Sequence, residues 1–242
     1  MQEGKGILIG HRGSAGLFPE NTLVGFKRAL GLGVRAFEFD VQLSHDGVPV
    51  LCHDSTVDRT TDGTGRVADY TWAQLQQLDA GSWFAKEYSE ESVPSLEQVL
   101  NLLSGYKNDG LLVNIELKNG PVFYSGLDQA ILNLINQFDI YDCTIISSFD
   151  HMALKKIREL DADVKVGVIT ASGIINPVEY MVRCKIDSYS YHPLWYFVTE
   201  KLIVNCKEKG IKVYPYTVND KKEINQLWDW GVDGIITDYP VT

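Results

Sequence analysis

Short, β-rich apolar runs alternate with longer helical patterns along almost the whole chain. The runs that predict strands are residues 6–10, 36–43, 110–117, 143–148, 164–169, 187–191, 211–217 and 234–237. The helical patterns between them cover residues 22–32, 95–103, 126–138, 151–160, 177–184, 199–209 and 220–230. Regular alternation of strand and helix predicts a parallel sheet, because each helix carries the chain back to the edge where the next strand begins.

The number of predicted strands favours a closed sheet over an open one. Eight parallel strands are the number that closes into a barrel. The alternative is an open, doubly wound sheet of the Rossmann type, which needs a GxGxxG motif after its first strand. No such motif follows residues 6–10. We therefore predict an α/β fold, a (β/α)8 TIM barrel, with the whole chain 1–242 forming one domain.

Residues 46–94 interrupt the alternation. They contain an extra apolar piece at 48–52 and a polar stretch rich in turn residues at 55–69. The segment is too long for a simple loop between a strand and a helix. We interpret approximately 54–94 as a small insertion after strand 2 that folds over the mouth of the barrel.

Composition excludes several classes of protein. A net charge of −10 and an isoelectric point near 4.9 argue against a nucleic-acid partner and against adhesion to anionic membranes. No run approaches the ~20 apolar residues of an integral membrane helix. The four cysteines form no CxxC pair. We expect a cytoplasmic monomer or homodimer, or an extracytoplasmic protein if a signal peptide has been removed.

Ionisable side chains gather where the predicted strands end, which is where a parallel barrel places its active site. Glu38 and Asp40 are two residues apart, so on a strand their side chains share a face, and Glu116 and Lys118 repeat this spacing. Three converging carboxylates would repel one another unless a cation lay between them. Ligation by oxygen alone favours Mg²⁺ or Ca²⁺ over zinc.

Two histidines in the first quarter of the chain suit proton transfer at neutral pH. His11 would emerge from the first strand and His53 from the segment after the second, so they could flank a phosphodiester from two sides. The planar guanidinium of Arg12 suits phosphate oxygens, and Lys118 adds a positive charge nearby. These residue types together indicate metal-assisted chemistry on a phosphate ester.

A series of motifs in this order resembles the glycerophosphodiester phosphodiesterase family, within the phospholipase C-like phosphodiesterase superfamily. The motifs are His11-Arg12-Gly13, Pro19-Glu20-Asn21-Thr22, Glu38-x-Asp40, Pro49-Val50, His53-Asp54, Asp58-Arg59-Thr60-Thr61, Gly63-x-Gly65, Pro94-Ser95-Leu96-Glu97, Asn114-x-Glu116-x-Lys118, Thr217-Val218-Asn219 and 231–240. The resemblance covers essentially the whole chain. It departs at Tyr216, where a tryptophan is common, and His192 extends a position that varies; both concern the leaving-group pocket.

The resemblance implies a βα barrel with a small insertion after strand 2 and one divalent cation, Mg²⁺ or Ca²⁺. It implies a role for each of seven residues: Glu38, Asp40 and Glu116 as metal ligands, His11 and His53 as the acid–base pair, and Arg12 and Lys118 as phosphate contacts. A glycerophosphodiester is then the small-molecule partner.

Other candidate residues keep two interpretations each. Glu20 is a candidate substrate contact, or with Asn21 it caps the first helix. His192 lines the pocket or makes a structural hydrogen bond. Trp195 lines the alcohol pocket or covers the core. Arg59 is best explained as a salt bridge that ties down the insertion.

The resulting function prediction is a metal-dependent hydrolase that cleaves glycerophosphodiesters to glycerol 3-phosphate and an alcohol, with two histidines as acid and base. One alternative is a lysophospholipase D-like enzyme acting on lipid diesters. The other is a barrel that binds phosphodiesters without catalysis, against which the presence of both histidines and all three carboxylates argues.

Overall fold

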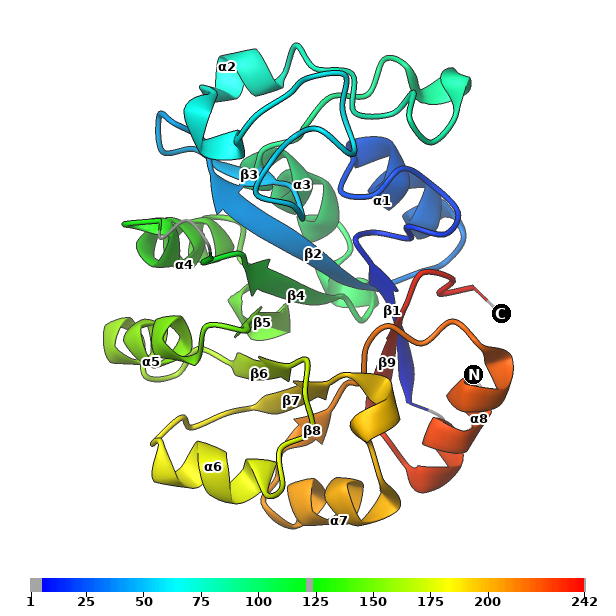
Figure 1. Ribbon diagram of the computed structural model, residues 1–242, viewed down its shortest axis with the longest axis vertical. Coiled ribbons are helices and arrows are strands. Elements are labelled where there is room, and N and C mark those ends of the chain that lie inside the picture. The colour runs from blue at the N-terminus through cyan, green and yellow to red at the C-terminus, as the bar shows by residue number, and fades with distance from the viewer. Residues whose placement is uncertain (1–5, 121–123, 242) are drawn as a thin grey trace.

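A computed structural model of the chain describes residues 6–120 and 124–241. Eight parallel strands form a barrel with helices on its outside (Figure 1). The strands are β1 (Ile7–His11), β2 (Ala36–Leu43), β4 (Leu112–Leu117), β5 (Thr144–Ser148), β6 (Val166–Thr170), β7 (Ser190–Pro193), β8 (Lys212–Val213) and β9 (Gly234–Thr237). Their order is β8-β7-β6-β5-β4-β2-β1-β9. The predicted TIM barrel is confirmed.

Hydrogen bonds from the segment around β8 to β9 close the barrel. The N–H of Ile236 donates to the carbonyl of Pro215 at 2.9 Å, and the N–H of Val218 donates to the carbonyl of Ile236 at 2.9 Å. Strand β8 is shorter than the predicted 211–217, because Pro193 and Pro215 have no N–H to donate to a regular ladder.

Seven helices cover the outside of the barrel close to their predicted ranges. They are α1 (Leu23–Gly31), α3 (Leu96–Ser104), α4 (Leu127–Gln137), α5 (His151–Leu160), α6 (Pro177–Arg183), α7 (Glu200–Glu208) and α8 (Lys221–Trp230). The side chains of Asp150 and Asp220 cap α5 and α8. The apolar helix faces pack on outward-pointing strand residues: Phe26 of α1 meets Phe37 and Phe39 of β2 edge-on, with ring centroids 5.6 and 5.4 Å apart. In the described part of the chain, no helix is long and apolar enough to cross a bilayer.

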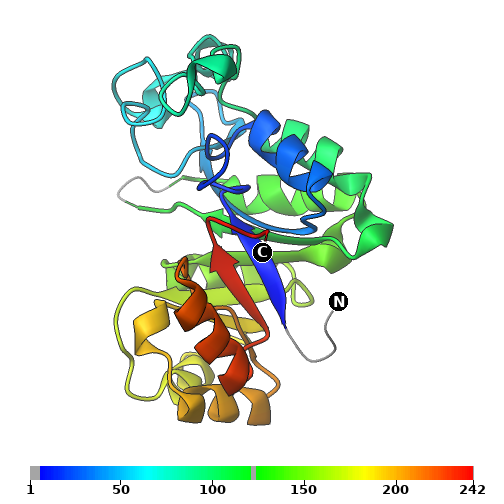
Figure 2. The ribbon, with the colours of Figure 1, turned by 90° about the vertical axis from the view of Figure 1, so that its right-hand side faces the viewer.

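The segment between β2 and α3 forms the insertion seen at the top of Figure 1 and at the upper left of Figure 2. Its apolar piece is an additional strand, β3 (Pro49–Leu51), which pairs antiparallel with β2. Short helices η1 (Val67–Asp69), α2 (Trp72–Leu75) and η2 (Lys86–Tyr88) follow. The insertion has a small hydrophobic core of its own, formed by Val50, Cys52, Val57, Val67, Leu75, Ala80 and Val93.

The barrel interior changes character along its axis. Its deeper layer is apolar and contains Ile9, Ala36, Ile145, Tyr214 and Ile236. Further along β1, β2 and β4 toward their carboxyl ends, the inward positions carry ionisable side chains. The fold therefore gathers charged groups at one end of an otherwise apolar interior.

Candidate active site

Three buried carboxylates meet at the carboxyl ends of β2 and β4. Each of Glu38, Asp40 and Glu116 offers an oxygen, and these oxygens all lie within 4.8 Å of one another. The register explains the meeting, because Asp40 lies opposite Glu116 in the parallel ladder and Glu38 lies two residues before Asp40 on the same face. The convergence expected from the sequence is present.

The carboxylate cluster fits a hard divalent cation. Glu38 Oε1 is buried and has no hydrogen-bond partner among the described residues, and the same holds for Asn21 Oδ1 beside the cluster. Buried polar atoms are normally paired, so these oxygens point to a bound ion or water. Burial, together with repulsion from Asp40, raises the pKa of both Glu38 and Glu116. A cation with oxygen ligands would relieve that repulsion.

Asp40 is the carboxylate whose charge the protein itself balances. Burial acts to raise its pKa, but Lys118 Nζ and Arg12 Nε, each 3.5 Å away, outweigh burial and lower it. Asn21 Nδ2 also donates to Asp40 Oδ2 at 3.0 Å. Asp40 is therefore held ionised before any metal arrives.

These pKa directions predict that metal binding releases protons. The raised pKa values of Glu38 and Glu116 mean that protons compete with the cation, so the affinity for Mg²⁺ or Ca²⁺ should rise with pH until both groups are ionised. Isothermal titration calorimetry in two buffers of different ionisation enthalpy measures the effect. Identical binding heats in both buffers would contradict it.

His11, at the end of β1, is oriented by a carboxylate that follows β9. Its Nδ1 lies 2.6 Å from Oδ1 of Asp238, whose Oδ2 accepts a hydrogen bond from Asn219 Nδ2. His11 Nε2 lies 3.9 Å from Oε2 of Glu38. With Nδ1 held by a carboxylate, Nε2 is the nitrogen that faces the carboxylate cluster and is available for proton transfer.

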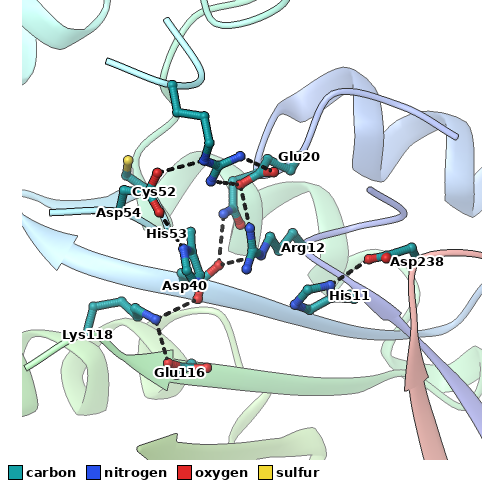
Figure 3. Close-up of polar contacts among 12 residues, drawn as sticks. His11, Arg12, Glu20, Asp40, Cys52, His53, Asp54, Glu116, Lys118 and Asp238 are labelled. Atoms are coloured by element: carbon teal, nitrogen blue, oxygen red, sulfur yellow. Dashed lines mark hydrogen bonds and ion pairs between the residues drawn. The ribbon is translucent and has the colours of Figure 1, made fainter. Parts of the chain in front are cut away.

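His53 follows β3 and has a similar arrangement (Figure 3). Its Nδ1 lies 2.7 Å from Oδ1 of the next residue, Asp54. Burial lowers the pKa of His53, although Asp40 opposes the shift. The imidazole is therefore neutral at physiological pH and able to accept a proton.

We predict that Asp238→Asn lowers kcat about 10- to 100-fold, the usual cost of losing a carboxylate that orients a functional histidine. The amide cannot hold the Nδ1–H tautomer of His11 as the carboxylate does. Steady-state kinetics measure the loss, and Asp220→Asn, at the N-cap of α8, is the control for a general effect on folding. An unchanged kcat in Asp238→Asn would show that this contact does not orient His11 for the reaction.

Arg12 is held in an uncommon backbone conformation. Its φ is 51° and that of Asn21 is 54°, both in the left-handed region that side chains other than glycine rarely occupy. The N–H of Arg12 donates to Glu38 Oε2 at 3.2 Å, and the N–H of Asn21 donates to the Arg12 carbonyl at 2.9 Å. Such strain persists only where surrounding contacts enforce it, and it concentrates at functional sites.

Glu20 and Lys118 both make ion pairs within the site. Glu20 is buried beside the cluster and bound by Arg12 and Arg59. It does not cap α1, because Thr22 does so through its side chain. Lys118 contacts Glu116 at 2.8 Å.

Among the described residues, no hydrogen bond or ion pair joins His192 or Trp195 to this cluster. His192 is inside the barrel, where Nε2 bonds to Ser190 Oγ and burial lowers the pKa to about 3. The absence of a side chain at Gly167 makes room for its ring. Trp195 begins η5 (Trp195–Phe197) after β7 and packs against the main core. Substrate binding by either residue stays a prediction.

Three contributors were not given their roles by the sequence. Asn21 is a hydrogen-bond donor to Asp40, Asp54 orients His53, and Asp238 orients His11. Asp54 could have been found from its position directly after a candidate base. The other two depend on contacts between distant segments.

The comparisons with known proteins agree with this geometry. The model of the glycerophosphoryl diester phosphodiesterase family matches residues 11–242. This chain belongs to that family. A glycerophosphodiester phosphodiesterase of Caldanaerobacter subterraneus subsp. tengcongensis is 39% identical over 238 residues, covering 98% of this chain and 96% of the relative. One from Bacillus altitudinis is 35% identical, covering 96% and 94%.

Solved structures of phosphodiesterases share the fold. A phosphodiesterase of Oleispira antarctica, in complex with the product sn-glycerol-3-phosphate, superposes with a TM-score of 0.87 at 33% identity and covers 98% of this chain and 94% of its own. A glycerophosphodiester phosphodiesterase of Agrobacterium tumefaciens gives a TM-score of 0.82 at 25% identity, covering 97% of each chain.

Proposed function

We propose that this chain is a phosphoric diester hydrolase that cleaves glycerophosphodiesters to glycerol 3-phosphate and an alcohol, with His11 and His53 as the acid–base pair. The observation that carries the proposal is the pairing of each histidine's Nδ1 with a carboxylate, beside a buried group of three carboxylates (Figure 3). Membership of the family and the glycerol phosphate bound to the Oleispira antarctica neighbour support the substrate class.

Each residue of the site has a defined task in this reaction. A divalent cation held by Glu38, Asp40 and Glu116 would polarise the phosphoryl oxygens. Arg12 and Lys118 bind phosphoryl oxygens and offset the negative charge that develops during transfer. Arg12 and Lys118 both keep their positive charge, because the surrounding carboxylates raise the pKa of each side chain against the effect of burial.

The two histidines handle the protons. One accepts a proton at Nε2 from the nucleophile, which is water or a neighbouring hydroxyl of the substrate. The other donates a proton to the oxygen of the leaving alcohol, so the pair ends the reaction with its protons exchanged. The lowered pKa of His53 suits it to the accepting role at neutral pH.

The proposed function is tested by following glycerol 3-phosphate release from glycerophosphocholine with a coupled dehydrogenase assay. Turnover should stop with EDTA and return with Mg²⁺ or Ca²⁺. A lysophosphatidylcholine arm tests the lipid-diester alternative, for which that substrate would be preferred; it is followed by choline release, because the phosphate product there is a lysophosphatidic acid. Binding without product in every metal would reject the hydrolase and leave a phosphodiester-binding barrel.

A further inference from the structure

Arg59 connects the insertion to the edge of the active site. Its Nη1 and Nη2 donate to the two carboxylate oxygens of Glu20, each at 2.8 Å, and its Nε donates to Asp54 Oδ2 at 2.7 Å. The two-pronged contact with Glu20 is the geometry in which a guanidinium binds a carboxylate most strongly. The salt bridge expected from the sequence is present, with one partner in the barrel, Glu20, and one at the start of the insertion, Asp54.

Glu20 is shared between two guanidinium groups. Arg12 Nη1 donates to Glu20 Oε1 at 2.9 Å, the same oxygen that receives Arg59 Nη2. Arg12 Nε has no hydrogen-bond partner among the described residues and lies 3.5 Å from Asp40 Oδ2. The side chains of Glu20 and Arg12 are 8% and 15% exposed, whereas that of Arg59 is 44% exposed, so solvent screens the pair of Glu20 with Arg12 less than its pair with Arg59. Arg59 also binds Asp54 and Arg12 also faces Asp40, so two guanidinium groups and three carboxylates form one network in which Glu20 is the shared member.

We propose that Arg59 is a positioning residue for phosphate binding: by engaging both oxygens of Glu20, it leaves Arg12 charged and free to bind phosphoryl oxygens. The inference builds on the proposed function, in which Arg12 contacts the phosphate. Without Arg59, the nearest cation for Glu20 is Arg12, and a two-pronged pair between them would occupy the N–H groups that phosphate needs.

Arg59 also holds the carboxylate that orients His53. Arg59 holds Oδ2 of Asp54, while Oδ1 faces Nδ1 of His53. Arg59 therefore holds both Glu20, which binds Arg12, and Asp54, the partner of His53.

The test measures binding of glycerol 3-phosphate by calorimetry in the presence of Mg²⁺, independently of turnover. Arg59→Gln should weaken binding about 10- to 100-fold, the cost of losing a charge-assisted contact. The affinity of Arg59→Lys should lie between those of the wild type and Arg59→Gln, because lysine keeps the charge without the paired geometry. Arg66→Gln is the matched control: Arg66 is an exposed arginine of the same insertion, and the variant should bind like the wild type.

The double variant Glu20→Gln/Arg59→Gln separates this role from simple anchoring. The amide that replaces the Glu20 carboxylate keeps an oxygen for Arg12 Nη1 but carries no charge, so the double variant should recover binding to within about threefold of the wild type. Binding as weak as that of Arg59→Gln would overturn the proposal, because it would show that Arg59 only holds the insertion in place. Normal binding in Arg59→Gln would overturn it as well.

Glu20→Gln tests the proposal independently in the event that Arg59→Gln lowers the melting temperature of the protein. Glu20→Gln alone removes the charge that competes for Arg12, so it should bind glycerol 3-phosphate at least as tightly as the wild type. Weaker binding would overturn the proposal. The proposed function fails on different evidence, namely a wild-type protein that neither binds glycerol 3-phosphate nor hydrolyses glycerophosphocholine.

Discussion

Replacing either His11 or His53 with alanine should lower kcat for glycerophosphocholine about 10²- to 10⁴-fold, the usual contribution of a general acid or base. The structure gives the reason, because each imidazole has Nδ1 bound to a carboxylate and therefore presents Nε2 for proton transfer. KM should change much less, since neither ring is the main contact with the charged phosphate. Steady-state kinetics at saturating metal measure both quantities.

Two further variants make the histidine prediction sharp. His45→Ala removes an exposed histidine just beyond the end of β2 and should leave kcat unchanged. The double variant His11→Ala/His53→Ala should be only slightly slower than the slower single variant, because groups that act in one proton-transfer sequence are not additive. Near-normal turnover in both single variants would remove the acid–base assignment.

Asp40→Asn should have a comparable effect through the metal. The substitution removes one negative charge of the candidate metal site and also the ion that balances Arg12 and Lys118, so the affinity for Mg²⁺ or Ca²⁺ should fall and kcat/KM should drop about 10³-fold or more. Calorimetry gives the affinity, and kinetics over a range of metal concentration show whether excess metal restores activity. Partial recovery at high metal concentration would identify the loss as one of binding.

An exposed carboxylate is the control for the metal prediction. Asp109, in η3 (Lys107–Asp109) before β4, is exposed, and Asp109→Asn should leave both affinity and turnover unchanged. Full activity of Asp40→Asn in the presence of EDTA would contradict a metal-dependent reaction.

The sequence predicted the barrel well because buried parallel strands and amphipathic helices have distinct local patterns. The strand and helix ranges agree with the structure to within a few residues, and the largest difference is β8, where Pro193 and Pro215 interrupt the ladder. Strand β3 was seen only as an apolar piece. Its antiparallel pairing with β2 depends on where the chain turns at 44–47, which a hydrophobic run alone does not encode.

The candidate site was predictable to the extent that it follows from the barrel's topology. Parallel strands bring their carboxyl ends together, so Glu38, Asp40 and Glu116 could be expected to meet. The partners of these groups could not, because Asn21 and Asp238 reach the site through loop conformations. The contact from Asn21 to Asp40, for example, depends on a left-handed backbone that the residue type only permits.

The separate hydrophobic core of the insertion divides the proposed acid–base pair between two packing units. His11 belongs to the barrel, whereas His53 lies next to Cys52 of the smaller core. A small core with few buried side chains is the kind of region that opens without global unfolding. Local opening would separate the two histidines while the barrel stays intact. Thermal inactivation should therefore begin below the melting temperature of the barrel. Glycerol 3-phosphate should reduce the difference between these two temperatures, because it would contact both units.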